Sequence, residues 1–238
     1  MGVDPHRLWL SHPGPQPRRG RRPGYSREAI TEAAVALADA EGLEAVTMRR
    51  VAAQVGAGVM SLYNYAPDKE TLLELMVDHV SGELLPASAA APPTGDWRAD
   101  LKAIGHLQRA LMLRHPWLPT ALATRRTPGP NALASLEHAL AALRPTGLDG
   151  ATKIEIFAQL TAFVAGHVRY EVSQAAASRS AERGAAEARY LAAVAADGHH
   201  PELAEALATA GRRPLAPEPP EAPFTRFLNR LIDGLDTD

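Results

Sequence analysis

Apolar residues recur at helical spacing along this chain, in stretches separated by segments rich in Pro and Gly at 86–96, 124–130 and 211–223. None of these stretches alternates apolar with polar residues or gathers Val, Ile and Thr, as strands do. The clearest stretch follows Pro223 and repeats at i, i+3, i+4, i+7, i+8 and i+11, with Phe224, Phe227, Leu228, Leu231, Ile232 and Leu235. The sequence therefore predicts an all-α fold.

Composition and charge narrow the class of protein. The 238 residues give enough length for a small domain joined to a larger one. The chain has no Cys, which excludes disulfides and thiolate metal sites. Its net charge of −2 gives no general argument for nucleic-acid binding, so such a function must rest on local charge and motifs. No segment has the pattern of a signal peptide or reaches the roughly 18 apolar residues of a membrane span, so we expect a cytoplasmic protein.

Residues 26–85 carry the caps and breaks of consecutive short helices. Ser26 is a favourable N-cap for a first helix, and Gly42 is a typical residue at its end. Thr47 is a favourable N-cap for a second helix, which ends at Gly56. We expect this segment to form one small helical domain.

A third short helix is predicted at 59–65, directly after the glycine that ends the second, and Pro67 and Asp68 open a longer fourth helix. Two short helices joined at a glycine form a helix-turn-helix, because the tight turn needs a residue free of Cβ crowding. Polar and aromatic side chains on the second of these helices can reach phosphates and base edges in a major groove; they are Ser61, Tyr63, Asn64 and Tyr65.

Residues 24–85 resemble the DNA-binding domain of the tetracycline-repressor (TetR) family. The most specific part is Leu62-Tyr63-x-Tyr65 followed by Pro67-x-Lys69-x-x-Leu72-Leu73. The wider run from Gly56 to Val80 resembles the subgroup whose C-terminal domain is like that of the tetracycline repressor itself. The resemblance implies a dimeric repressor with a three-helix DNA-binding domain, a connector helix, and a larger C-terminal domain for ligand binding and dimerisation.

The resemblance also assigns roles to individual residues. Those implied to hold phosphates are Thr47, Arg49, Tyr63 and Lys69. Those implied to face the DNA are Val59, Met60, Ser61, Asn64 and Tyr65. Two positions depart from the family pattern: Gly58 replaces the usual capping or polar residue, and Ala66 stands where many members have a bulky apolar one.

Residues 1–25 are rich in Pro, Gly and Arg without periodicity, which predicts a flexible arm before the first helix. Its basic residues Arg18, Arg19, Arg21 and Arg22 directly precede the first helix. A flexible arginine arm can bind phosphates or enter a minor groove. A solvated tail without contacts is the equally weighted alternative.

Residues 96–238 are expected to form the C-terminal domain, after a linker at 86–96. Its helices are predicted over 96–114, 131–143, 180–210 and 223–235, with a further short helix after His115-Pro116 and a long helix that starts near Asp149 and runs past Tyr170. The long helix from Asp149 is apolar on two faces, so it must be covered on both. We therefore expect 151–172 and 223–235 to pair with the same helices of a second copy in a four-helix bundle.

The family resemblance places a small-molecule pocket among the C-terminal helices. Candidate ligand-binding residues are Trp97, Leu101, Gln108, Met112, Trp117, His138, Phe157, Thr161 and His167. Core packing is the competing interpretation for each of them. Thr161 and His167 stand out because polar groups on an apolar helix need partners or a polar cavity. The candidates suit a hydrophobic ligand, and no metal or cofactor site is expected.

The sequence thus predicts a homodimeric repressor that binds palindromic operator DNA and is released by a small-molecule ligand. The first alternative is an all-α ligand-binding or adaptor protein without sequence-specific DNA binding, which the departures at Gly58 and Ala66 permit. The second is a helical enzyme. No nucleophile elbow, carboxylate pair or metal-ligand spacing supports catalysis, so no enzymatic activity is expected.

Overall fold

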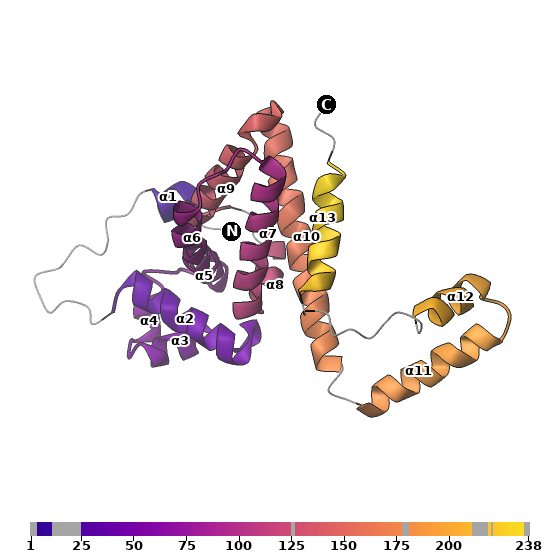
Figure 1. Cartoon of the computed structure of the whole chain (residues 1–238). Coiled ribbons are helices and arrows are strands. Elements are labelled where there is room, and N and C mark those ends of the chain that lie inside the picture. Colours follow the sequence, from indigo (N-terminus) through magenta and orange to yellow (C-terminus); the bar gives the residue numbers. More distant parts are fainter. Residues whose placement is uncertain are drawn as a thin grey trace, which may run out of the picture.

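A computed structural model describes residues 4–10, 25–124, 127–177, 181–210, 219 and 221–235. Every regular element in these ranges is a helix, which confirms the all-α prediction. Figure 1 shows a small group of helices near the N-terminus, α2 to α4, beside a larger group built from α5 to α10 and α13. No helix in these ranges is long and apolar enough to cross a membrane.

The predicted caps form the N-terminal helices α2 (Arg27–Glu41) and α3 (Met48–Gln54). Ser26 Oγ accepts a hydrogen bond from Ala29 N at 3.1 Å, and Thr47 Oγ1 accepts one from Arg50 N at 3.3 Å. Each bond satisfies one of the unpaired N–H groups of a first helical turn. Gly56, in the turn after α3, has φ of +68°, a conformation that side chains with Cβ disfavour.

The third helix, α4 (Val59–Leu62), is shorter than the predicted 59–65. The next residues tighten into a turn, with Asn64 N bonded to Ser61 O and Tyr65 N to Leu62 O. Such i to i+3 bonds often close the end of a helix. Leu62 and Ala66 on either side of this turn are fully buried against the other N-terminal helices.

The connector helix α5 (Lys69–Ser81) begins at the predicted cap, where Asp68 Oδ1 accepts from Thr71 N and Thr71 Oγ1, both at 2.7 Å. The predicted break at 86–96 is wrong in its first half. The chain continues through η2 (Gly82–Leu84) into α6 (Leu85–Ala90), and only residues 91–96 are irregular. Pro86 lies in the first turn of α6, where its missing N–H is not needed.

Part of the predicted N-terminal arm is folded. Residues Pro5–Trp9 form the short helix α1, and Leu8 is buried. The Arg27 guanidinium donates two 3.2 Å hydrogen bonds to Leu8 O and lies 5.8 Å from the Trp9 ring. These contacts explain why the segment is not a free arm. The four arginines at 18–22 lie outside the described residues.

The C-terminal core is built on α10 and α7, which pack along each other, and α13 packs against α7 and contacts α10 through Phe224 and Phe163. Figure 1 shows α10 and α13 side by side. The helices of this group are α7 (Trp97–Arg114), α8 (Leu118–Thr124), α9 (Pro130–Ala142), α10 (Gly150–Ala177) and α13 (Ala222–Asp233), with the 3-10 turn η3 (Arg144–Thr146). Their starts and ends follow the predicted ranges to within a few residues at most positions, and α10 runs past Tyr170 as predicted.

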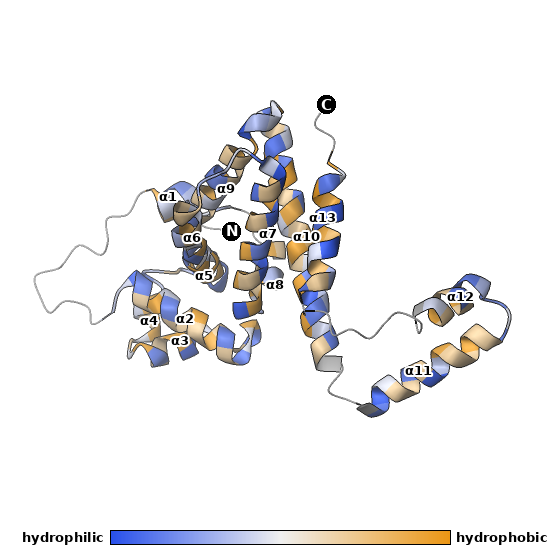
Figure 2. Cartoon of the chain, viewed as in Figure 1, coloured by the Kyte–Doolittle hydropathy of each residue, from blue (hydrophilic) through white to orange (hydrophobic). Residues whose placement is uncertain are grey.

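Helices α11 (Ala181–Ala196) and α12 (Pro201–Ala210) pack on one another and extend away from the core (Figure 1). Many of their residues are alanine, so parts of α11 have hydrophobic colours although the helix is exposed (Figure 2). This agrees with the predicted exposed helices over 180–210.

Candidate nucleic-acid interface and ligand pocket

Helix α4 presents one face to solvent and anchors the other in the N-terminal core. Met60 is 79 % exposed and Tyr63 41 %, whereas Leu62 is fully buried. Asn64 is exposed, and Val59 and Ser61 are half-buried, with Val59 also packed against the core. Met60, Tyr63 and Asn64 are therefore accessible to a groove, and the DNA contacts of Val59 and Ser61 stay a prediction.

Tyr65 differs from these residues because it packs inward. Its ring makes an edge-on contact with Tyr25, with centroids 6.0 Å apart. Burial, and then the proximity of Tyr25 and Glu28, raises the pKa of the Tyr65 hydroxyl. Any contact between Tyr65 and DNA stays a prediction, and the structure gives it a packing role.

The two departures from the family pattern fit the local packing. Ala66 is fully buried, so its small side chain fills the available space. A Cβ added at Gly58 would meet only Ser61 Oγ, at 3.8 Å, so larger residues would also fit there. Neither position disturbs the exposed face of α4.

Cations surround this surface, but not all are available for phosphates. Arg50 is held by Glu41 in a two-point ion pair, with N–O distances of 2.6 and 3.0 Å. Arg49 is exposed and has no ion pair within the described part of the chain. Lys69 is exposed, and its Nζ makes one long 3.4 Å contact with Leu43 O. Thr47, Arg49 and Lys69 are thus exposed, and the phosphate contacts that the resemblance implies for them stay a prediction.

A polar cluster joins the N-terminal helices to the C-terminal core. Asp39 Oδ1 on α2 accepts from Trp117 Nε1 at 2.6 Å and lies 2.8 Å from His115 Nδ1. The other ring nitrogen of His115 lies 3.1 Å from Glu83 Oε1, and Glu83 also pairs with Arg114. Trp117, a predicted ligand residue, therefore has a structural partner and lines none of the described cavities.

A cavity of about 510 Å³ opens between α8, α9 and α10. This size lies within the usual range of small-molecule sites. Of the predicted ligand residues, Phe157 and Thr161 line it. Its other lining residues are Pro119, Leu122, Ala123, Thr127, Pro128, Ala132, Leu136, Ala158, Ala162, Ala165, Gly166 and Arg169.

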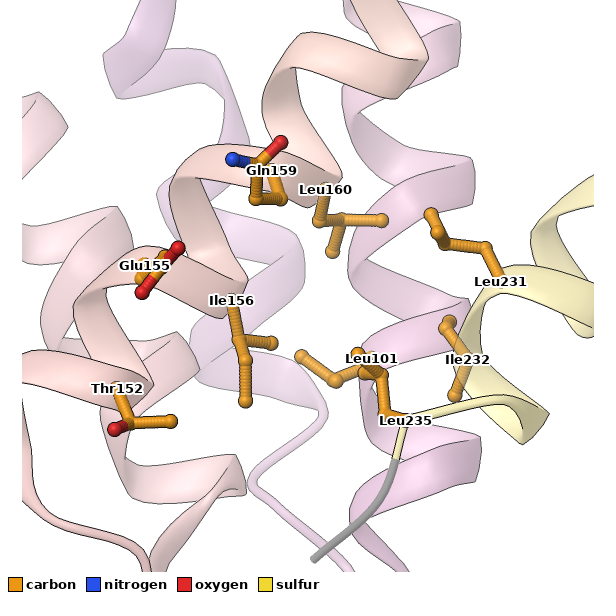
Figure 3. Close-up of a pocket in the computed structure, with 9 residues that line it drawn as sticks. All are labelled: Leu101, Thr152, Glu155, Ile156, Gln159, Leu160, Leu231, Ile232 and Leu235. Carbon is orange, nitrogen blue, oxygen red and sulfur yellow. The ribbon is translucent and has the colours of Figure 1, made fainter.

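The other predicted ligand residues lie elsewhere. Leu101 lines a second cavity of about 210 Å³ between α7, α10 and α13, where apolar side chains converge (Figure 3). Gln108 and His138 line a small space of about 10 Å³ next to Phe157. The side chains of Trp97 and Met112 are buried in the core and line none of the described cavities.

His167 packs against α13 and is not a lining residue of the 510 Å³ cavity. Its ring and that of His106 each contact the buried Phe224 edge-on, with centroids 5.2 Å apart. Burial lowers the pKa of both imidazoles, and the Arg109 cation also lowers it, while a nearby carboxylate opposes the shift. Both rings are therefore favoured in their neutral form.

The wall of the larger cavity is tied to the connector helix. Asp78 on α5 is buried, and its Oδ1 accepts from Asn131 N at 3.0 Å and Ala132 N at 3.1 Å, at the start of α9. Asn131 Nδ2 in turn donates to Asp78 O at 3.0 Å. Ala132 and the preceding Pro128 line the cavity. A change in the cavity therefore has a direct route to α5.

Sequence reasoning missed Gly166 and Arg169, which both line the larger cavity. A signal existed for Gly166, because an isolated glycine within a long helical pattern is unfavourable unless packing or function requires it. Arg169 gave no such signal, since an arginine on a long helix is common at the surface.

The chain matches two family models. Residues 30–76 match "Bacterial regulatory proteins, tetR family", and residues 89–238 match "Tetracyclin repressor-like, C-terminal domain". Within residues described here, no group of three or more His, Asp or Glu side chains is arranged to hold a metal ion.

Curated relatives and solved structures agree with these matches. The HTH-type transcriptional repressor DrrR1 of Streptomyces coeruleorubidus is 36 % identical over 237 residues, which covers 96 % of this chain and 83 % of the relative. An HTH-type transcriptional regulator of Saccharopolyspora erythraea is 32 % identical, covering 70 % of this chain and 68 % of the relative. The TetR family protein ActR of Streptomyces coelicolor, solved in complex with actinorhodin, is 26 % identical with a TM-score of 0.69, covering 90 % of this chain and 97 % of that chain.

These matches span both parts of the chain, and they coincide with a helix-turn-helix that presents an exposed face and with a C-terminal core that holds a cavity. The chain therefore belongs to the TetR family of DNA-binding transcriptional regulators, in the group with a tetracycline-repressor-like C-terminal domain.

Proposed function

We propose that this protein is a homodimeric repressor that binds a palindromic operator and is released from it by a small molecule in the cavity between α8, α9 and α10. One observation carries the proposal: α5 begins at Lys69, beside the DNA-binding surface, and its Asp78 is hydrogen-bonded to the wall of that cavity. The solved structure of the relative ActR in complex with actinorhodin supports a small-molecule effector.

The mechanism is a shift between two conformations. A ligand that binds better when the start of α9 has moved also favours a moved α5, because Asp78 joins the two. The two copies of α4 in a dimer are then no longer separated by the distance between successive major grooves. The Asp39 cluster makes the N-terminal helices follow the C-terminal core, which transmits the same movement.

DNA binding is tested by mobility shift at several salt concentrations, with fragments of the intergenic DNA upstream of the protein's own gene. We expect tight binding that weakens with salt, and loss of binding in Tyr63→Ala and Lys69→Ala. Arg144→Ala, at an exposed position of η3 outside the proposed dimer interface, is the matched control, and it should bind as the unchanged protein does. Equal affinity for random DNA would contradict the proposal and favour a ligand-binding protein without sequence-specific DNA binding.

The dimer interface is proposed on α10 and α13. The apolar stripe of α13 divides into two faces: Phe224, Leu228 and Ile232 are buried in the protomer, while Phe227 is 51 % and Leu231 36 % exposed. Ile154 on α10 is also 49 % exposed. Exposed apolar side chains of this size on neighbouring helices suit a bundle with a second copy.

Leu231→Asp should give monomers by light scattering, since it places a charge in this bundle. Leu133→Asp on α9 replaces another exposed leucine, 49 % exposed, and should leave the dimer unchanged. A dimer that survives Leu231→Asp would place the interface on another surface.

A further inference from the structure

We propose that the cavity between α8, α9 and α10 takes a flat, apolar molecule that carries an anionic group, and that Arg169 binds this group. The inference rests on the proposed function, because it specifies the class of effector for the same cavity. It goes further by assigning a charge to the ligand and a binding role to one side chain.

Apolar residues make up most of the cavity wall, and alanine and glycine are the commonest of them. Helix α10 contributes three alanines and a glycine, and α8 and α9 contribute one alanine each. The larger apolar side chains are Leu122, Leu136 and Phe157. A wall of small residues beside one aromatic ring leaves a broad, smooth apolar surface. Such a surface favours an extended ring system over a compact polar ligand.

The neutral polar groups of the wall are already engaged. Thr161 Oγ1 donates to Phe157 O at 2.9 Å and accepts from Gln108 Nε2 at 3.0 Å. Thr127 also has an interaction within the protein. These side chains therefore offer little to a polar ligand group.

Arg169 is the exception among the lining residues. It is the only charged residue among those that line the cavity in the described part of the chain, and no carboxylate lines it. The positions three and four residues away on α10 are uncharged: Ala165, Gly166, Val172 and Ser173. An arginine keeps its charge at any working pH and offers several N–H donors to an anion.

The nearest acidic residue in the sequence is held elsewhere. Glu171 accepts two hydrogen bonds from Arg109, at 3.1 Å from Nε and 2.6 Å from Nη2. Arg169 is exposed and has no ion pair within the described residues. A cation at the edge of an apolar cavity, with no carboxylate partner, is well placed to bind an anionic substituent of a ligand.

Gly166 provides the space for such a ligand beside Arg169. It lies one turn before Arg169, and a Cβ added there would meet no atom within 4 Å. Glycine within a helix costs about 0.5–1 kcal/mol relative to alanine, although alanine would fit here. The open position leaves room for a ring system beside the guanidinium stem.

The test compares two fluorescent probes of similar shape. 1-Anilinonaphthalene-8-sulfonate is an apolar aromatic anion, and N-phenyl-1-naphthylamine is its neutral counterpart. Arg169→Gln should weaken the anionic probe about tenfold, a typical loss for one partly solvated charge-assisted contact, and should leave the neutral probe unchanged. Salt should weaken the anionic probe only when Arg169 is present. Arg144→Gln, at an exposed arginine of η3, is the matched control and should change neither affinity.

Gly166→Leu locates the probes. Its side chain should enter the cavity without meeting protein atoms, so both probes should lose affinity while the helical content stays the same. Equal loss of both probes in Arg169→Gln, or no loss of the anionic one, would overturn the role of Arg169. Failure of the anionic probe to bind the unchanged protein, or binding that Gly166→Leu does not reduce, would overturn the ligand class at this site. Operator binding is measured without probes, so failure of the proposed function is seen separately.

Discussion

Replacement of Asp39 by alanine should weaken the junction between the N-terminal helices and the C-terminal core. The carboxylate serves two groups at once, Trp117 Nε1 at 2.6 Å and His115 Nδ1 at 2.8 Å. Trp117 is 5 % exposed and His115 4 %, so water reaches neither donor easily. The variant therefore leaves two buried N–H groups without their acceptor.

The magnitude follows from the cost of each unpaired group. A buried donor that loses its partner costs about 1–3 kcal/mol. Asp39 itself is about one third exposed, and the space it leaves can admit water, so the lower half of that range applies to each donor. We expect the free energy of unfolding to fall by about 2–4 kcal/mol in Asp39→Ala. Asp39→Asn keeps one acceptor oxygen and should lose roughly 1 kcal/mol.

Equilibrium urea unfolding at a fixed protomer concentration measures these differences, followed by circular dichroism and tryptophan fluorescence. Glu32→Ala, at an exposed position of the same helix, is the control and should change stability by less than about 0.5 kcal/mol. In the folded Asp39→Ala protein, the effect of ligand on operator affinity should also change, because the junction no longer holds α2 to the core. A loss no larger than that of Glu32→Ala would refute the assigned role of the cluster.

Two further predictions concern packing and pH. Gly129→Ala should lower the melting temperature by the equivalent of about 1–3 kcal/mol, because its Cβ would lie 2.4 Å from Asp78 Oδ1. Gly150→Ala is the control, since a Cβ there meets nothing within 4 Å. Equal melting temperatures of the two variants would contradict the prediction. The pKa of His106 and of His167 is lowered in the folded protein, so as pH falls these side chains take up protons in the unfolded chain first. Their contribution to the free energy of unfolding is therefore fully present above the ordinary histidine pKa of 6.5, and it is lost as pH falls from there toward the folded-state pKa. Urea unfolding between pH 7.5 and 5 should show this loss, and the double variant His106→Asn/His167→Asn should reduce it; an unchanged pH dependence would mean that other groups are responsible.

The positions of helix ends were largely determined by the sequence. A serine, threonine or aspartate cap bonds to a backbone N–H two or three residues away, so Ser26, Thr47, Asp68 and Asp96 act through contacts that are local in the chain. The all-α class, the helix-turn-helix and the connector followed from such local signals and from helical periodicity. Pro86 misled the prediction because proline marks both a break and a first helical turn.

Which face of each helix is covered was decided only by the tertiary structure. The stripe of α13 was evident, but its division into a buried Phe224 and an exposed Phe227 depends on where α7 and α10 lie. Asp39 and Trp117 are separated by 78 positions, and no periodicity links them. Arg169 became a candidate ligand residue only when three helices met around a cavity. Periodicity identifies the apolar side of a helix, whereas the partners of that side, and the space left between them, depend on how distant segments pack.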